Sequence, residues 1–171
     1  AAMYTNTTGG ANTAVGTDAL YSNTTGDYNV AVGKGALDAN TTADNNTAIG
    51  LAALGANTTG AGNTAMGSGA LAANTTGTGN IAMGRNALIA NTTANYNTAI
   101  GHGAGAAVTT GAQNTLVGMQ AGDAITTGSN NVIMGISCDV GSGGVGNAMV
   151  MGDSVTGVGG NNFTFGNGTL D

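Results

Sequence analysis

The sequence lacks the residues from which a thick hydrophobic core is usually built. It has no proline and no tryptophan, and its 171 residues include only four tyrosines and two phenylalanines. A chain with so few large side chains must stack thin layers of small residues, each layer burying its neighbour. The single cysteine, Cys138, excludes an intrachain disulfide. It stands where other repeats have alanine, so we expect a small buried side chain rather than a reactive thiol.

Charge is also scarce. Lys34 and Arg85 are the only strong bases, the eight acidic residues are all aspartate, and the net charge is −6. Without a basic cluster, we expect no nucleic-acid partner and no binding to anionic membranes. No apolar run approaches the ~20 residues of a membrane-spanning helix, so we expect no membrane insertion. Regularly spaced Val, Ile, Leu and Met argue against disorder.

What the sequence does contain is a repeat. The pentapeptide Asn12-Thr13-Ala14-Val15-Gly16 begins again at every seventeenth position along the chain. Ala148 keeps this step, and a last copy at Asn162 follows after a shorter one. Such a period predicts a solenoid with one coil per unit, in which equal positions stack about 4.8 Å apart. The stacked asparagines are expected to form a hydrogen-bonded ladder: Asn12, Asn29, Asn46, Asn63, Asn80, Asn97, Asn114 and Asn131.

Counted from its asparagine, each unit begins with an alternating pattern typical of a short strand. Positions two and four share one face, and position three lies on the other. We predict that position four fills the interior: Val15, Val32, Ile49, Met66, Met83, Ile100, Val117 and Met134. Position three is predicted to lie near a subunit contact, because small residues allow close approach: Ala14, Ala31, Ala48, Ala65, Ala82 and Ala99. The two faces could be exchanged, and Ala48→Arg is expected to dissociate or unfold the assembly.

Position five is always glycine, which predicts a backbone corner with positive φ or a neighbouring backbone too close for a Cβ. These corner glycines are Gly16, Gly33, Gly50, Gly67, Gly84, Gly101, Gly118, Gly135, Gly152 and Gly166. An Ala-Leu pair such as Ala19-Leu20 follows and is predicted to form a second short strand. Asn-Thr-Thr, as at Asn23, then predicts a turn.

The regular repeat occupies residues 1–147, and residues 148–171 are interpreted as irregular terminal coils that form a cap or a junction. The chain starts in the middle of a unit and without methionine, so we interpret it as a processed or excised piece of a longer protein.

Arrays of the form Asn-Thr-Ala-Val-Gly-x-x-Ala-Leu-x-x-Asn-Thr-Thr-Gly resemble fibre segments of phage tail fibres. Val30-Ala31-Val32-Gly33 is similar to the β-roll heads of trimeric autotransporter adhesins. The resemblance implies a left-handed parallel β-roll with three chains to a rod. The repeat step of this chain is longer than the usual adhesin step and implies an added loop at Asn-Thr-Thr. The stalk and membrane-anchor barrel of the adhesins are not seen in the sequence.

Four other functions have partial support in the sequence. Hexapeptides such as Val15-Gly16-Thr17-Asp18-Ala19-Leu20 resemble those of β-helix acyltransferases, but they occur once per coil, and His102 is the only candidate base. Asp27 and Asp44 would stack and could hold Ca²⁺. Threonine columns could bind ice, although neighbouring threonines should point to opposite faces. Asn-x-Thr sequons such as Asn40 would lie on an exposed loop.

The sequence therefore predicts an all-β chain, a parallel β-solenoid of about ten coils assembled as a homotrimer, and the resemblance implies a left-handed β-roll or β-helix. We expect no enzyme activity, cofactor or metal. The expected function is that of a shaft or head segment of an extracellular or virion fibre. Such a segment would project, or provide, attachment to a host surface through a cell-surface glycan or another receptor. The alternative is a subunit of a self-assembling extracellular filament stacked head to tail.

Overall fold

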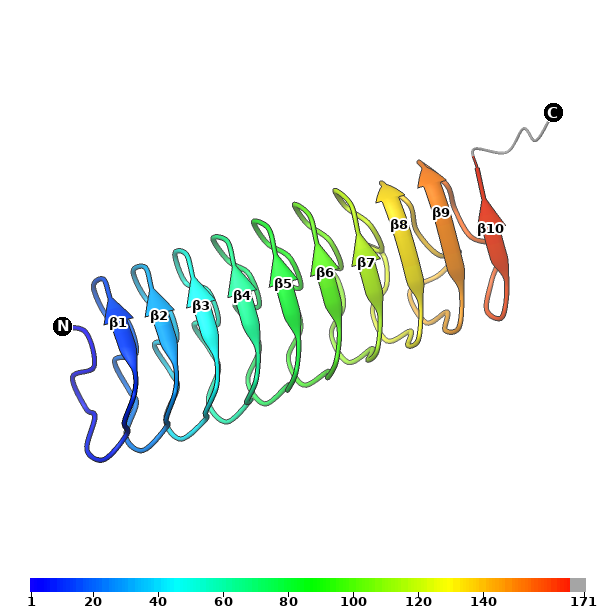
Figure 1. The fold of residues 1–171 in the computed structure, drawn as a ribbon. Helices are drawn as coiled ribbons and strands as arrows, with labels where there is room; N and C mark the ends of the chain where they lie inside the picture. Colours follow the sequence, from blue (N-terminus) through cyan, green and yellow to red (C-terminus); the bar gives the residue numbers. More distant parts are fainter. Residues whose placement is uncertain (167–171) are drawn as a thin grey trace.

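The computed structural model describes residues 1–166, and all ten strands among them belong to one parallel sheet of a β-solenoid (Figure 1). Each coil contributes one strand, and no helix occurs in this part of the chain. The strands are β1 (Thr13–Val15), β2 (Val30–Val32), β3 (Thr47–Ile49), β4 (Thr64–Met66), β5 (Ile81–Met83), β6 (Thr98–Ile100), β7 (Thr115–Val117), β8 (Val132–Ile136), β9 (Met149–Asp153) and β10 (Phe163–Phe165).

The sheet order follows the chain order from β1 to β10. The register repeats the sequence period, so that Ala31 pairs with Ala48 and Ala48 with Ala65. The last step is shorter, and Phe163 pairs with Met149. The result is a rod with the first coil at one end and β10 at the other (Figure 1). Residues 167–171, the end of the predicted terminal segment, lie outside the described residues.

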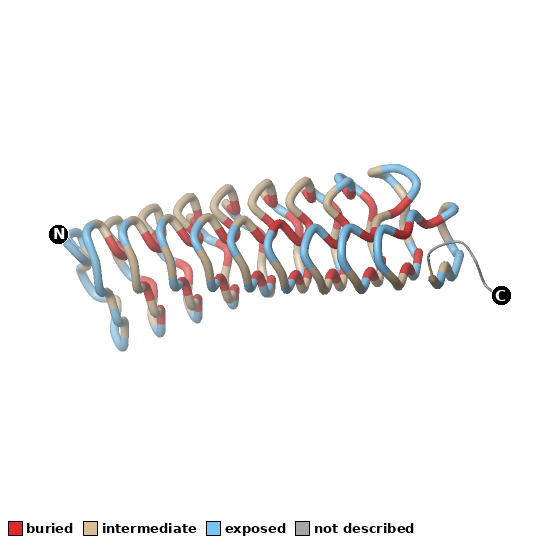
Figure 2. Tube along the Cα trace, turned by 90° about the horizontal axis from the view of Figure 1, so that it is seen from above, coloured by how far each residue is buried: buried red, intermediate tan, exposed pale blue. Residues whose placement is uncertain are grey.

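The interior of the rod is lined mainly by positions three, eight and nine of the coils. Ala48 and Leu54 have no exposed surface, and the same holds for their counterparts in the neighbouring coils. Figure 2 shows these buried residues recurring at the same places from coil to coil. Each leucine therefore reaches across a thin interior to the alanines of the sheet.

This arrangement reverses the predicted assignment of the strand faces. The position-four column, Val15 to Met134, faces outward: Val15 is 57% exposed, Ile49 37% and Met66 39%. The position-three column is inside, because Ala31, Ala48, Ala65, Ala82 and Ala99 are 0% exposed and Ala14 packs against the same core. The prediction fails because leucine at position nine already occupies the narrow interior, which leaves room for only a methyl group opposite.

The predicted second strand at Ala-Leu is also absent from the described residues. Leu20, Leu37, Leu54, Leu71 and Leu88 have φ between +51° and +52°, a left-handed conformation that strands do not use. These segments are turns, although the coils still bond there: the Leu54 N–H donates to Ala70 O at 3.0 Å. The turn aims the leucine inward, and complete burial of this side chain offsets the conformational cost of about 1 kcal/mol.

The coil of β7 exchanges large and small residues between the two sides of the core, and the coil of β6 loses its leucine. Glycine replaces leucine at Gly105 and Gly122, and Leu116 replaces the alanine of the sheet. A Cβ added at Gly105 would lie 2.6 Å from Leu116 Cδ1, and one at Gly122 would lie 2.7 Å from Leu116 Cδ2. Leu116 therefore fills the space that both missing leucines would have occupied. In the coil of β7 the large side chain thus enters the core from the sheet instead of from the turn.

The corner glycines from Gly16 to Gly135 have both properties that the sequence suggested. The first nine have φ between +127° and +148°. At Gly50 a Cβ would also lie 2.6 Å from the carbonyl carbon of Gly67 in the next coil. A side chain there would face an unfavourable backbone conformation and a direct clash with backbone.

Two ladders of buried asparagine run along the rod. In the strand-start ladder, at position one, the Asn63 N–H donates to Asn46 Oδ1 at 2.9 Å, and Asn46 Nδ2 donates to Gly60 O at 2.9 Å. All eight asparagines predicted for this ladder take part in it. In the turn ladder, at position twelve, Asn57 Nδ2 donates to Asn40 Oδ1 and to Gly60 O. These amides satisfy backbone groups that the turns would otherwise leave unpaired.

Candidate functional site

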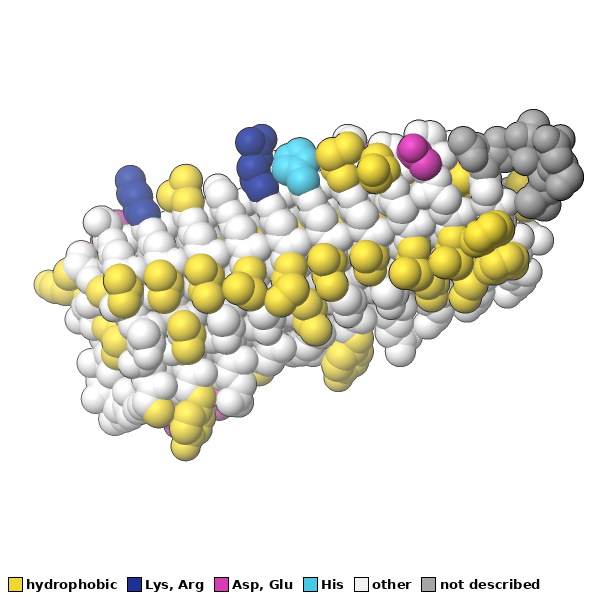
Figure 3. All heavy atoms as spheres, turned by 45° about the horizontal axis from the view of Figure 1, so that its top comes forward, with side chains coloured by type: hydrophobic (Ala, Val, Ile, Leu, Met, Phe, Trp, Pro, Cys, Tyr) yellow, Lys and Arg dark blue, Asp and Glu magenta, His cyan; other side chains and the backbone are white. Residues whose placement is uncertain are grey.

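The outstanding surface feature is the outward side of the ten-stranded sheet, formed by positions two and four and called here the strand face. Figure 3 shows hydrophobic side chains in a continuous row along the rod. Members that are at least 37% exposed are Val15, Ile49, Met66, Ile81, Met83, Ile100, Met134, Met149, Phe163 and Phe165. A soluble monomer rarely leaves so long an apolar surface uncovered.

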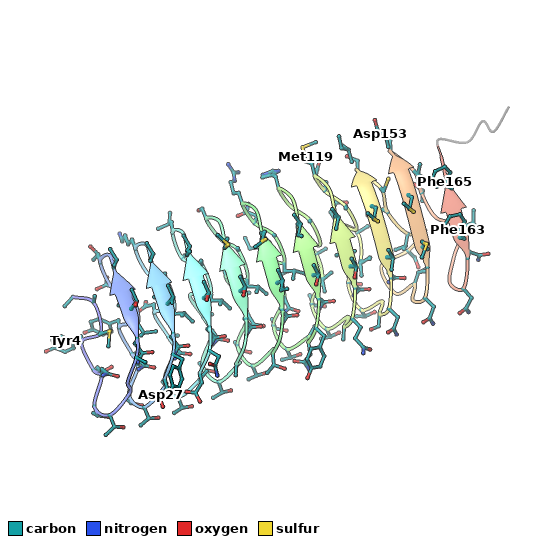
Figure 4. The ribbon with its side chains drawn as sticks, viewed as in Figure 1. Tyr4, Asp27, Met119, Asp153, Phe163 and Phe165 are labelled. Carbon is teal, nitrogen blue, oxygen red and sulfur yellow. The ribbon has the colours of Figure 1, made fainter. Side chains whose placement is uncertain are left out.

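The strand face is bounded by two edges of different composition. The end edge, at position six just beyond each corner glycine, consists of Thr17, Lys34, Leu51, Ser68, Arg85, His102, Met119, Ile136 and Asp153. The start edge, at position seventeen, consists of Ala11, Tyr28, Asn45, Gly62, Gly79, Tyr96, Gln113, Asn130, Asn147 and Asn161. Figure 4 shows the separation: Met119 and Asp153 project beyond the arrowheads, whereas Asp27 lies at the opposite end of the strands.

The strand face grows larger toward the last coils. Phe163 and Phe165 of β10 occupy the places held by Thr13 and Val15 in β1. Their rings stack with centroids 6.2 Å apart and remain 63% and 57% exposed. Figure 4 shows both rings on β10. This end of the face offers the most apolar area per coil.

The threonine turn has a mainly structural role. At position thirteen, Thr24 Oγ1 donates to Thr41 O at 3.0 Å, and Thr58 Oγ1 donates to Thr75 O at 3.0 Å. The next threonine, such as Thr25, is exposed. Half of the threonine hydroxyls at this turn thus already bond the protein and are not free to order a water lattice.

The Asn-Thr-Thr sequons of the turn ladder from Asn23 to Asn91 are not exposed, contrary to the sequence-based expectation. Asn23, Asn40 and Asn57 are 0% exposed, and each side-chain amide donates within the turn ladder. An oligosaccharide cannot be attached to such a nitrogen without removing the asparagine from the core. The hydrogen-bonding need of the turn, rather than glycosylation, accounts for these sequons.

The residues considered for catalysis and metal binding do not come together. His102 stands alone on the end edge, and no group of three or more His, Cys, Asp or Glu side chains suited to a metal occurs among residues 1–166. Asp27 Oδ1 accepts the Gly10 N–H at 2.7 Å, and Asp44 Oδ1 accepts the Asp27 N–H at 2.7 Å. The aspartates at position sixteen thus accept hydrogen bonds from backbone N–H groups of the preceding coil. Cys138 is buried.

One carboxyl group has an altered environment that the sequence did not indicate. Burial raises the pKa of Asp139 from 3.8 to about 6, and a hydrogen bond and charge repulsion from Asp123 act in the same direction. The backbone N–H groups of Val140 and Ala124 donate to this carboxyl and oppose the rise in its pKa. Asp123 follows β7 and Asp139 follows β8, so the pair lies on the turn side of the rod, away from the strand face.

The part of the chain that the structure describes contains no helix long and apolar enough to span a membrane. Among residues 1–166, the row of exposed apolar side chains on the strand face suits packing of one surface against another. No protein-family model, curated protein or solved structure matches this chain.

Proposed function

We propose that this chain is a shaft or head segment of a trimeric fibre that stands outside the cell or on a virion and projects, or provides, attachment to a host surface. One observation carries the proposal: position four of the strand face carries a large apolar side chain from β1 to β10, and none of these side chains is buried, on a rod whose interior is already filled. A surface of this kind is stable in water when copies of the chain cover it for one another.

The dimensions of the strand face suit a subunit contact. Nine steps of about 4.8 Å give a length of roughly 43 Å, and three strand residues span about 10 Å. The flat area is therefore about 400 Å² before side-chain relief and the two edges are added. Stable interfaces bury roughly 800 Å² on each partner, so the face together with its edges reaches the required scale.

The width of the sheet supports three copies. From position seventeen to position six, the polypeptide spans six residue steps, or roughly 20 Å. Three such sheets arranged as a triangular prism would each lie about 6 Å from the common axis. That distance is close to half of the ~10 Å separation at which packed sheets fill the space between them with side chains. Val, Ile and Met from three copies are the residues suited to fill this centre.

Three copies around an axis would make a rod whose stiffness comes from continuous ladders, since every coil bonds both neighbours. The resemblance to tail-fibre and adhesin repeats agrees with this mechanical role. It also favours a position outside the cell, where a glycan or another receptor on the host is the natural partner. The parallel arrangement of identical coils would present any weakly binding group many times, which favours multivalent attachment.

The test is the mass of the particle in solution. Wild-type protein is expected to give a discrete trimer by mass photometry and sedimentation. Ile49→Glu with Met66→Glu on the strand face should give a folded monomer with unchanged circular dichroism, because both side chains are outside the core. Thr42→Glu with Thr59→Glu, which places the same charges on the exposed turn, should remain trimeric.

A wild-type monomer, or a face variant that remains trimeric, would overturn the proposal. Growth of particle size with concentration would instead identify the head-to-tail filament.

A further inference from the structure

The two edges of the strand face carry a matched pattern of residues. Lys34 follows β2, and Tyr28 precedes it. His102 follows β6, and Tyr96 precedes it. Both tyrosines are 64% exposed. No other coil has tyrosine at the start edge.

The remaining basic residue fits the same pattern. Arg85 follows β5, which is preceded by Gly79. A Cβ added at Gly79 would lie 2.7 Å from Cδ1 of Tyr96, so the tyrosine ring extends over this glycine to the level of β5. All three residues of basic type in the chain therefore lie at levels where an aromatic ring occupies the opposite edge of the same sheet. Within one chain, the two edges are separated by the full width of the sheet and cannot touch.

Rotational symmetry about the rod axis brings these edges together. When identical sheets are placed around an axis parallel to the rod, each strand runs around the axis in the same sense. The end of a strand in one copy then meets the beginning of the equivalent strand in the next copy, at the same level. The end edge of each copy thus faces the start edge of its neighbour along the whole rod.

We propose that the copies associate in parallel and in register, with Lys34 contacting Tyr28 and Asp27 of the adjacent copy and with Arg85 and His102 contacting its Tyr96. This inference rests on the proposed function, since it requires that the strand face be covered by further copies of the chain. It adds the direction of packing, the register and the residues that set both.

The chemistry of the pairs is favourable. Ammonium and guanidinium groups are attracted to the face of a tyrosine ring, and the long stems of Lys and Arg can lie along it. Asp27 lies on the same level as Lys34 and supplies an opposite charge in a protein that has only two strong bases. A shift of one coil in either direction would move Lys34 away from Tyr28, so these contacts select a single register.

Antiparallel packing predicts different neighbours. Suppose that two copies packed face to face in opposite directions with their midpoints aligned. The end edge of one copy would then meet the end edge of the other, and β2 would lie beside β9. Lys34 would then meet Asp153, but Arg85 would meet His102 of the other copy, and both tyrosines would lack a basic partner. The arrangement can therefore be distinguished by which pairs of positions come close.

Intermolecular crosslinking tests the inference directly. In a Cys138→Ala background, Tyr28→Cys with Lys34→Cys should give covalent dimers and trimers with a short bis-maleimide, because the two thiols of one copy lie at opposite ends of β2. Tyr28→Cys with Met119→Cys uses an exposed residue of the same end edge five coils away and should remain monomeric on a denaturing gel. Lys34→Cys with Asp153→Cys should crosslink only in an antiparallel assembly.

A trimer by mass photometry without the Tyr28–Lys34 crosslink overturns this inference and leaves the proposed function standing, whereas a wild-type monomer overturns both.

A second measurement uses Tyr28→Asn and Lys34→Ser, residue types that other coils carry at the same positions. Each substitution should weaken the contact roughly two- to fivefold. Because a trimer has three such contacts, each substitution should raise the trimer dissociation constant about 10- to 100-fold. The double variant should raise the dissociation constant little further than either single variant. Additive effects would contradict a direct Lys34–Tyr28 contact.

Discussion

The side-chain oxygen of Asn91 has no hydrogen-bond donor, because Val108 occupies the place one coil later from which an asparagine amide would donate. It is the only buried side-chain nitrogen or oxygen without a partner in the described part of the chain. Asn91 is thus the last member of the turn ladder, and beyond it apolar residues take over the same column.

The end of this ladder leads to a first prediction, which compares Asn57→Ala with Asn91→Ala. The first change removes the donor to Asn40 Oδ1 and leaves a second buried oxygen unpaired. The second change removes the donor to Asn74 Oδ1 but also removes the oxygen that was already unpaired. Asn57→Ala should therefore cost about 1–3 kcal/mol more than Asn91→Ala. Thermal unfolding followed by circular dichroism measures the difference, and equal melting temperatures would show that the ladder oxygens contribute little.

A second prediction concerns the exchange of core residues in coil seven. Leu116→Ala should leave a cavity and cost about 2–5 kcal/mol. Gly122→Leu alone should also destabilise, because its side chain would enter space occupied by Leu116. The double variant restores the alanine and leucine arrangement within this coil and should recover part of the lost stability, because the space beside Gly105 stays empty. Denaturant midpoints of the four proteins measure the coupling, and additive losses would contradict the proposed sharing of space.

The corner glycines give a third prediction. Gly50→Ala should strongly destabilise the rod, because the new Cβ would lie 2.6 Å from the carbonyl carbon of Gly67 at a φ of +136°. Gly62→Ala is the matched control: its φ is +68°, but nothing lies within 4 Å of the added carbon. The control should lose only about 1 kcal/mol from backbone strain. Melting temperatures compare the two, and a similar small loss in both would show that coils can move apart at the corner.

A fourth prediction concerns pH. The pKa of Asp139 is raised in the folded protein to about 6 from 3.8, so between these values the unfolded chain releases a proton that the folded chain keeps. Stability should therefore be fully present below about pH 4, decrease as the pH rises toward 6, and level off above it. Asp123→Asn removes the repulsion that contributes to the raised pKa, and the decrease should become shallower.

Denaturant midpoints between pH 4 and 7 test this expectation, with Asp153→Asn as a control on the end edge. Asp38 adds a change of the same sign, since burial and then the charge of Asp18 raise its pKa. A variant at Asp123 whose profile equals that of the wild type would contradict the role of the pair.

The period of the sequence was enough to predict the solenoid, its parallel pairing and the register of the strands. The orientation of the strand could not be decided in the same way, because both faces are apolar and the larger residues at position four were expected inside. The sequence did contain a relevant signal. Leu116 replaces alanine in the coil where Gly122 replaces leucine, and such an exchange indicates that positions three and nine face each other across the core.

Other features depend on contacts that a pattern alone does not reveal. The left-handed turn at Leu54 was missed because leucine rarely adopts positive φ, and only complete burial makes it favourable here. The burial of Asn40 was missed because Asn-Thr-Thr is usual in exposed turns. The two edges of the strand face depend on where the turns place positions six and seventeen, which the repeat pattern alone does not specify.

The direction of the asparagine bonds gives the rod a polarity. In both ladders every bond from one asparagine to another donates toward the preceding coil, as Asn63 does to Asn46 and Asn57 does to Asn40. The amide dipoles therefore add head to tail over many coils and strengthen one another. The rod therefore has a donor pole at its first coil and an acceptor pole further along, and a further coil could extend a ladder at either pole only by continuing this bond direction.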